Sequence, residues 1–117
     1  MQISGPISVG EFLDRMSILE IKLENGLEVQ TELNFYLTKK DLIDARGFKH
    51  FYGIIKKINQ ALWALEDEKR NSVERYSENY SDVSTLITQL NDLRHQTKKY
   101  IDIFFKSEIK ELKSHKF

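Results

Sequence analysis

Residues 51–76 read FYGIIKKINQALWALEDEKRNSVERY, and residues 83–105 read VSTLITQLNDLRHQTKKYIDIFF. In both segments the large apolar residues recur at alternating spacings of four and three. This heptad pattern is typical of helices that pack along one continuous seam. The apolar members of the seam are Phe51, Ile55, Ile58, Leu62 and Leu65, followed by Val83, Ile87, Leu90, Ile101 and Phe104. The connection between the two segments is short and polar, which predicts two adjacent antiparallel helices.

A helix with clear boundaries precedes this pair. Ser8 and Glu11 fit a capping box, in which the Ser8 hydroxyl accepts from the Glu11 amide and the Glu11 carboxylate reaches back to the Ser8 amide. Gly26, after Asn25, is a favourable left-handed stop. The sequence therefore predicts a helix over 8–24.

The remaining elements follow from apolar patterning and turn residues. A stripe that includes Val29, Leu33 and Ile43 predicts a second helix over 27–43. The heptad segments extend to helices over 48–76 and 81–106, with Ser81 as the N-cap of the last helix. The sequence has no linker rich in Pro and Ser, no low-complexity run and no internal repeat that would separate a second domain. The fold class predicted is all-α: one domain over residues 1–117, an antiparallel helical bundle with a coiled-coil-like hairpin.

Composition narrows the classes of partner. The chain has 117 residues, with 18 Lys and Arg against 18 Asp and Glu, so its formal net charge is zero. A protein that grips nucleic acid needs a cationic face to displace counterions, so we do not expect a nucleic-acid partner. The chain contains no cysteine, which excludes disulfides, thiolate catalysis and cysteine-ligated zinc.

The sequence also indicates the cellular location of the protein. Its longest stretch without Asp, Glu, Lys or Arg is 1–10, far short of the about 20 apolar residues that a membrane-spanning helix needs. The same stretch lacks the basic and apolar regions of a signal peptide. We therefore expect a cytoplasmic protein with no membrane partner.

One charged residue interrupts the second seam. Arg94 occupies a core-facing position between Leu90 and Ile101. Because an unpaired buried guanidinium is costly, Arg94 is predicted to be paired with a carboxylate or to lie near water. Folding the hairpin about its turn makes Glu66 the first candidate partner, and Glu20 on the first helix is the second. If this pair only fixes helix register, Arg94→Met is expected to leave stability unchanged or to raise it by up to a few kcal/mol.

Other polar residues complete a candidate cluster. Asn59 and Trp63 share an edge of their helix with Glu66, and Asn91 lies one turn from Arg94. The candidate polar or ligand-binding set is Glu20, Asn59, Trp63, Glu66, Asn91 and Arg94. This set could form an ion pair that fixes the helix register, a ligand pocket or a catalytic group. We favour the ion pair.

Metal and cofactor chemistry find little support. His50, His95 and His115 lie on separate segments, and none has the Glu-x-x-His companion of di-iron bundles. The glycines are isolated, so no glycine-rich phosphate loop is formed. We expect no metal ligands, no cofactor and no catalytic residues.

Several segments together resemble a known family. Residues 7–15, ISVGEFLDR, and 18–24, ILEIKLE, are similar to the opening of a family of short helical proteins of bacteria and their phages, which carries a domain of unknown function. The resemblance continues at Asn59, Leu62-Trp63, Glu66-Asp67, Asn91-Asp92 and Arg94, and again at Ser107-Glu108-Ile109, Glu111 and Lys113-Ser114. It implies that the candidate polar residues coincide with the positions of the family's motifs.

The expected function is a non-enzymatic one. A short chain with several aromatic residues has difficulty burying them all alone, so we expect a small interaction or assembly protein that forms homo-oligomers or binds a protein partner. The alternative is a helical bundle that binds an anionic small molecule, a nucleotide or a sugar phosphate, through Arg94 with Trp63 stacking beside it. The weaker alternative is a carboxylate-based enzyme that uses Glu20 and Glu66 as acid and base.

Overall fold

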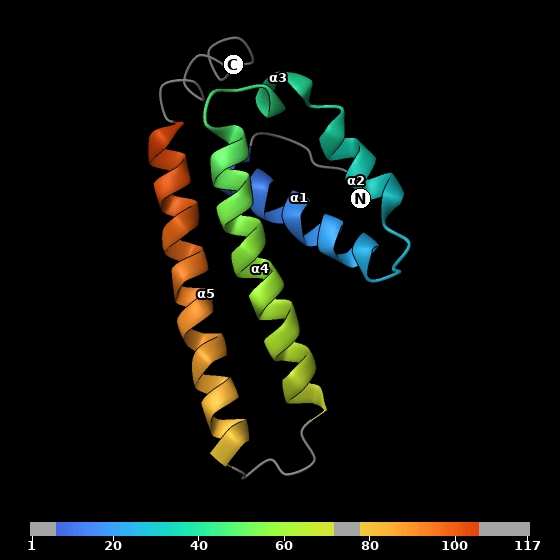
Figure 1. The fold of residues 1–117 in the computed structure, drawn as a ribbon. Coiled ribbons are helices and arrows are strands. Elements are labelled where there is room, and N and C mark those ends of the chain that lie inside the picture. Colours follow the sequence, from blue (N-terminus) through green and yellow to red (C-terminus); the bar gives the residue numbers. More distant parts are fainter. Residues whose placement is uncertain (1–6, 72–77, 106–117) are drawn as a thin grey trace.

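The predicted all-α bundle is confirmed. The computed structural model describes residues 7–71 and 78–105, and the regular elements in these residues are all helices. They are α1 (Val9–Glu24), α2 (Gln30–Leu37), α3 (Lys40–Ile43), α4 (Phe48–Arg70) and α5 (Glu78–Phe104). The long helices α4 and α5 lie side by side and antiparallel, as the heptad segments predict (Figure 1).

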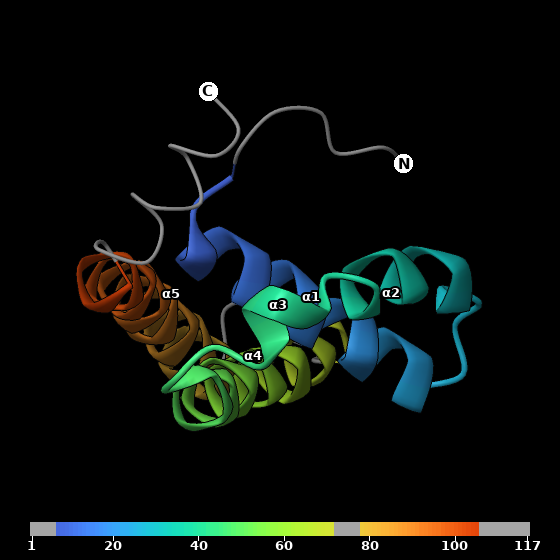
Figure 2. The ribbon, with the colours of Figure 1, turned by 90° about the horizontal axis from the view of Figure 1, so that it is seen from above.

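The three shorter helices cover only part of this pair. α1 crosses α4 and α5 over the half that holds the start of α4 and the end of α5, with α2 packed on α1 and α3 near the start of α4 (Figure 1). Seen from above, α1 and α2 occupy one side of the pair (Figure 2). The opposite side of α4 and α5 therefore carries no other helix among the described residues.

The core is divided into two apolar clusters. The larger one joins α1 to the helices around it, and its buried members are Val9, Phe12, Leu13, Met16, Leu33, Tyr36, Phe48, Phe51, Ile55, Ile101 and Phe105. The smaller one lies beyond α1, between α4 and α5, and its buried members are Ile58, Leu62, Val83 and Ile87. Both clusters draw on the predicted heptad seam, and polar side chains lie where they meet.

The boundaries of α1 follow the sequence signals. The Ser8 hydroxyl caps the helix by accepting from the Glu11 amide at 3.1 Å. The expected reciprocal bond is replaced, because the Glu11 carboxylate contacts Arg15 and Lys98 instead. At the other end Gly26 has φ of +85° and the Leu27 amide donates to the Lys22 carbonyl at 3.0 Å, which is the Schellman arrangement.

The single second helix predicted over 27–43 is wrong, because α2 and α3 are separate. The Thr38 hydroxyl donates to the Phe35 carbonyl at 2.7 Å, and Lys39 then leaves the helical conformation, with ψ of 59°. α3 then starts separately, with the Ile43 amide donating to the Lys39 carbonyl at 3.1 Å. The residues after Gly26 also remain outside α2 until Gln30.

The two long helices differ from the prediction at the end of α4 and at the start of α5, on either side of the connection between them. α4 ends at Arg70 with Asn71 as its C-cap, and the rest of its predicted extension, like the predicted end of the last helix at residue 106, lies outside the described residues. α5 begins at Glu78, so Ser81 is inside the helix and is not its N-cap. Residues 78–81 contain neither Gly nor Pro, so no helix-breaking residue separates the start of α5 from Ser81.

Candidate functional site

The polar side chains between the two apolar clusters converge on Asp14 of α1. Asp14 is 1% exposed and receives two hydrogen bonds from Arg94 of α5, from Nε to Oδ1 at 2.8 Å and from Nη2 to Oδ2 at 2.6 Å. Asn59 of α4 donates from Nδ2 to the same Oδ1 at 2.8 Å, and also to the Ser17 hydroxyl at 2.8 Å. We call Asp14, Ser17, Asn59 and Arg94 the polar cluster. It ties α1, α4 and α5 together at one level.

A glycine lets α1 approach α5 closely beside this cluster. The Gly10 amide donates to Asp102 Oδ1 at 2.7 Å, and a Cβ at Gly10 would collide with the Lys98 carbonyl. Lys98 Nζ lies 2.5 Å from Glu11 Oε2 and 3.4 Å from Asp14 Oδ2. The first turns of α1 are therefore bonded to α5 by backbone, by charge and by the polar cluster.

Electrostatics keep the buried carboxylate ionised. Burial by itself raises the pKa of Asp14, but the hydrogen bonds from Arg94 and Asn59 and the charges of Arg94 and Lys98 outweigh it, so the pKa is below its usual value. The pKa of Glu11 is lowered, chiefly by its hydrogen bond with Lys98. The pKa of Arg94 is raised by its hydrogen bonds to Asp14. Each charge thus stabilises the other.

These shifts predict how stability depends on pH. The folded-state pKa values of Asp14 and Glu11 are lowered, so between the folded and unfolded values the unfolded chain binds more protons. Their stabilising effect is present above the unfolded values, near pH 4, and is lost as the pH falls through the folded ones. The free energy of unfolding, measured with urea from about pH 6 to pH 3, is expected to fall most steeply below about pH 4.

Two variants separate this effect from general acid denaturation. Asp14→Asn is expected to flatten the pH dependence, whereas Asp67→Asn is expected to leave it nearly unchanged, because Asp67 belongs to a pair with Arg70 in which both side chains are well exposed. Equal slopes for the wild type and Asp14→Asn would contradict the assignment of the titrating group.

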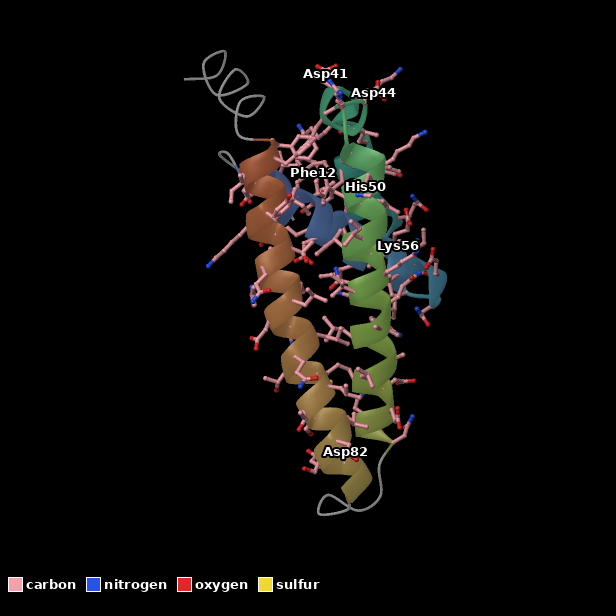
Figure 3. The ribbon with its side chains drawn as sticks, turned by 60° about the vertical axis from the view of Figure 1, so that its left-hand side comes forward. Phe12, Asp41, Asp44, His50, Lys56 and Asp82 are labelled. Carbon is pink, nitrogen blue, oxygen red and sulfur yellow. The ribbon has the colours of Figure 1, made fainter. Side chains whose placement is uncertain are left out.

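A second ion-pair group lies at the other end of α1. Lys56 of α4 contacts the carboxylate of Glu20 and bonds Glu24 Oε2 at 2.8 Å, and its side chain points from α4 toward α1 (Figure 3). Burial lowers the pKa of Lys56, but the hydrogen bonds and charges of these two carboxylates raise it above the usual value. Burial, with the nearby charge of Glu20, raises the pKa of the Tyr52 hydroxyl. This group anchors the C-terminal half of α1 on α4.

The structure places only part of the predicted set together. Arg94 and Asn59 meet in the polar cluster, with the Arg94 side chain 25% exposed. The two expected partners of Arg94 are wrong. Glu66 is exposed, because α1 does not extend over the part of α4 beyond Asn59, and Glu20 is engaged by Lys56. Trp63 and Asn91 are half-buried and lie outside the polar cluster.

The residue that sequence reasoning missed is Asp14, the acceptor at the centre of the site. It belongs to a stripe on α1 in which Gly10, Asp14, Ser17 and Ile21 follow spacings of four, three and four. All four residues of this stripe are buried. Small and polar residues repeated at helical spacing were the available signal, because they indicate a face on which another helix approaches closely.

Other kinds of site receive no support from the described residues. Within residues 7–71 and 78–105, no three His, Asp or Glu side chains lie together as a metal ion would require. None of the helices described is both long and apolar enough to cross a membrane. Comparisons with protein-family models, with curated proteins and with solved structures find no match to this chain.

Proposed function

We propose that this chain is a small non-enzymatic assembly protein that works by binding protein through the side of α4 and α5 opposite α1. The observation that carries the proposal is an apolar surface on that side, which we call the open face. Its members are Ile54 of α4 and Leu86, Leu93, Tyr100 and Phe104 of α5, and they are between 38% and 64% exposed.

Helical geometry puts the open face away from α1. Asp102, which bonds α1, lies about half a turn around α5 from Leu93. On α4, Asn59 and Lys56 contact α1, and Ile54 lies on the other side of the helix. An exposed apolar patch that runs along two neighbouring helices is a common feature of protein-binding surfaces.

The geometry supports the anionic-ligand alternative less well. Arg94 directs Nε and Nη2 at Asp14, so the donors that would hold a phosphate are already paired with a carboxylate of this chain. Lys98, the nearest other cation, contacts Glu11 and Asp14. A bound anion would have to displace a bidentate, mostly buried pair, which is costly.

The enzymatic alternative is also less well supported. The two carboxylates considered for acid and base catalysis lie on different helices, with Glu20 bonded to Lys56 and Glu66 exposed. Two groups that exchange protons with one substrate must both reach it within hydrogen-bond distance.

The proposal also includes a cytoplasmic location and membership of the family of short helical proteins of bacteria and their phages. The absence of cysteine supports the cytoplasmic location.

The proposal is tested by the size of the protein in extracts of the cells that produce it. We expect the wild type to elute in an assembly larger than its own 13.8 kDa, and Leu93→Glu to elute at the size of one chain. His95→Glu, which places the same side chain on an exposed position of α5 outside the open face, serves as the control and is expected to behave as wild type. A wild type of single-chain size that is stabilised by nucleotides or sugar phosphates would favour the anionic-ligand alternative.

A further inference from the structure

We infer that the occupant of the open face is a second copy of this chain, packed with its helices antiparallel across a two-fold axis. This inference rests on the proposed function and names its partner. The dimer would contain two layers of two helices, packed face to face, in which α4 packs on α4 of the second copy and α5 packs on α5. Three features of the open face support it: its internal symmetry, its charge pattern and its size.

The large residues of α5 are spaced symmetrically about Leu93. Leu86 precedes it by one heptad, and Tyr100 follows it by one heptad, so all three lie along the same stripe. When two such helices cross antiparallel with Leu93 on Leu93, Leu86 of each copy lies opposite Tyr100 of the other. A surface that matches itself when reversed is what a two-fold interface requires.

α4 has its own midpoint at the same level. Ala61 lies centrally between Ile54 and Glu68, and Ala61 and Ala64 are small enough for two helices to approach. Asn59 of α4 and Arg94 of α5 both bond Asp14 Oδ1, which puts them at one level of the antiparallel pair. Counting in the same direction from there, Ala61 lies two residues from Asn59 and Leu93 lies one residue from Arg94, so the two midpoints differ in height by about 1.5 Å. One axis can therefore pass through both midpoints.

The charges around the open face fit the reversed arrangement. The stripe of α5 from Leu86 to Phe104 has no charged side chain on the open face. On the exposed edge of α4, Lys57 precedes Ala61 and Glu68 follows it. Reversal about Ala61 brings Lys57 of each copy within one helical turn of Glu68 of the other, which forms two ion pairs. A parallel arrangement would place like charges together.

The size of the surface is adequate for a dimer. Two helices of this length present a face of about 35 by 20 Å, or about 700 Å², close to the about 800 Å² per partner of ordinary stable interfaces. At one end the face deepens into a groove of about 670 Å³, lined on α4 by His50 and Ile54 and on α5 by Thr97, Tyr100 and Phe104. In the two-fold arrangement this groove receives Leu86 of the second copy.

The arrangement is tested by disulfide formation, since the chain has no native cysteine. Leu93→Cys is expected to form a covalent dimer on mild oxidation, because Leu93 faces its own copy. Leu86→Cys and Tyr100→Cys are each expected to stay unlinked, since each residue lies about 20 Å from its copy, but a mixture of the two is expected to cross-link. Cross-linking of each variant with itself would show a parallel pair and overturn the inference.

Sedimentation of the purified protein tests the partner itself. We expect the wild type and His95→Glu to form a dimer at twice 13.8 kDa, and Leu93→Glu to raise the dissociation constant by about 30-fold or more, as loss of a central interface residue does. A purified wild type that stays monomeric overturns the second copy as occupant. If extracts still show an assembly that depends on Leu93, the proposed function stands with a different partner. If they do not, both fail.

Discussion

Replacing Arg94 with methionine is expected to lower the free energy of unfolding by about 3–5 kcal/mol. The reason is the partner that the substitution leaves behind. Asp14 is almost completely buried and receives two of its hydrogen bonds from Arg94, so the variant strands a charge in the protein interior. Only Asn59 and the more distant Lys98 remain to compensate it. Urea unfolding at neutral pH measures the loss.

Two further variants show whether the loss comes from the stranded charge. Arg70→Met removes an arginine from an exposed pair with Asp67 and is expected to change stability by no more than about 0.5 kcal/mol. Asp14→Leu combined with Arg94→Met removes both buried charges and is expected to recover most of the loss. If Arg94→Met alone were as stable as wild type, the polar cluster would not stabilise the fold, and the expectation drawn from the sequence would be correct.

The sequence was sufficient to predict the features that depend on residues close together along the chain. The heptad spacing placed Arg94 on an inward-facing position, and the fold class and the caps of α1 at Ser8 and Gly26 followed from local rules. Those features depend on neighbours in the sequence. Local rules did not predict the break at Lys39, which separates the predicted second helix into α2 and α3.

The partner of Arg94 depends on information of a different kind. It is set by the level at which α1 crosses the hairpin, and this level is determined by long-range packing of α1 against α5. Counting along the hairpin pointed to Glu66, but α1 crosses at the level of Asn59 and brings Asp14 instead. The glycine at position 10 marks that crossing, because it has no side chain where α5 passes.

Gly10→Ala is therefore expected to destabilise the protein by about 2–3 kcal/mol, a large effect for one methyl group. The added Cβ would collide with the carbonyl of Lys98, which is backbone of α5 and cannot rotate away, and would lie 2.9 Å from Asp102 Oδ1. α1 must then move away from α5, which weakens the bond between the Gly10 amide and Asp102 and draws Asp14 from Arg94. Thermal and urea unfolding both measure the result.

Gly53→Ala is the matched control, and the change is expected to have the opposite sign. Gly53 lies inside α4, and a Cβ there meets no atom within 4 Å. Alanine in an open helical position is expected to stabilise by about 0.5–1 kcal/mol, because it restricts the unfolded chain and favours the helix. If Gly10→Ala also stabilised the protein, α1 could not lie as close to α5 as the polar cluster requires. If Gly10→Ala destabilises the protein and Gly53→Ala stabilises it, the lack of a side chain at position 10 is what allows α1 to approach α5. The same close approach places Asp14 against Arg94.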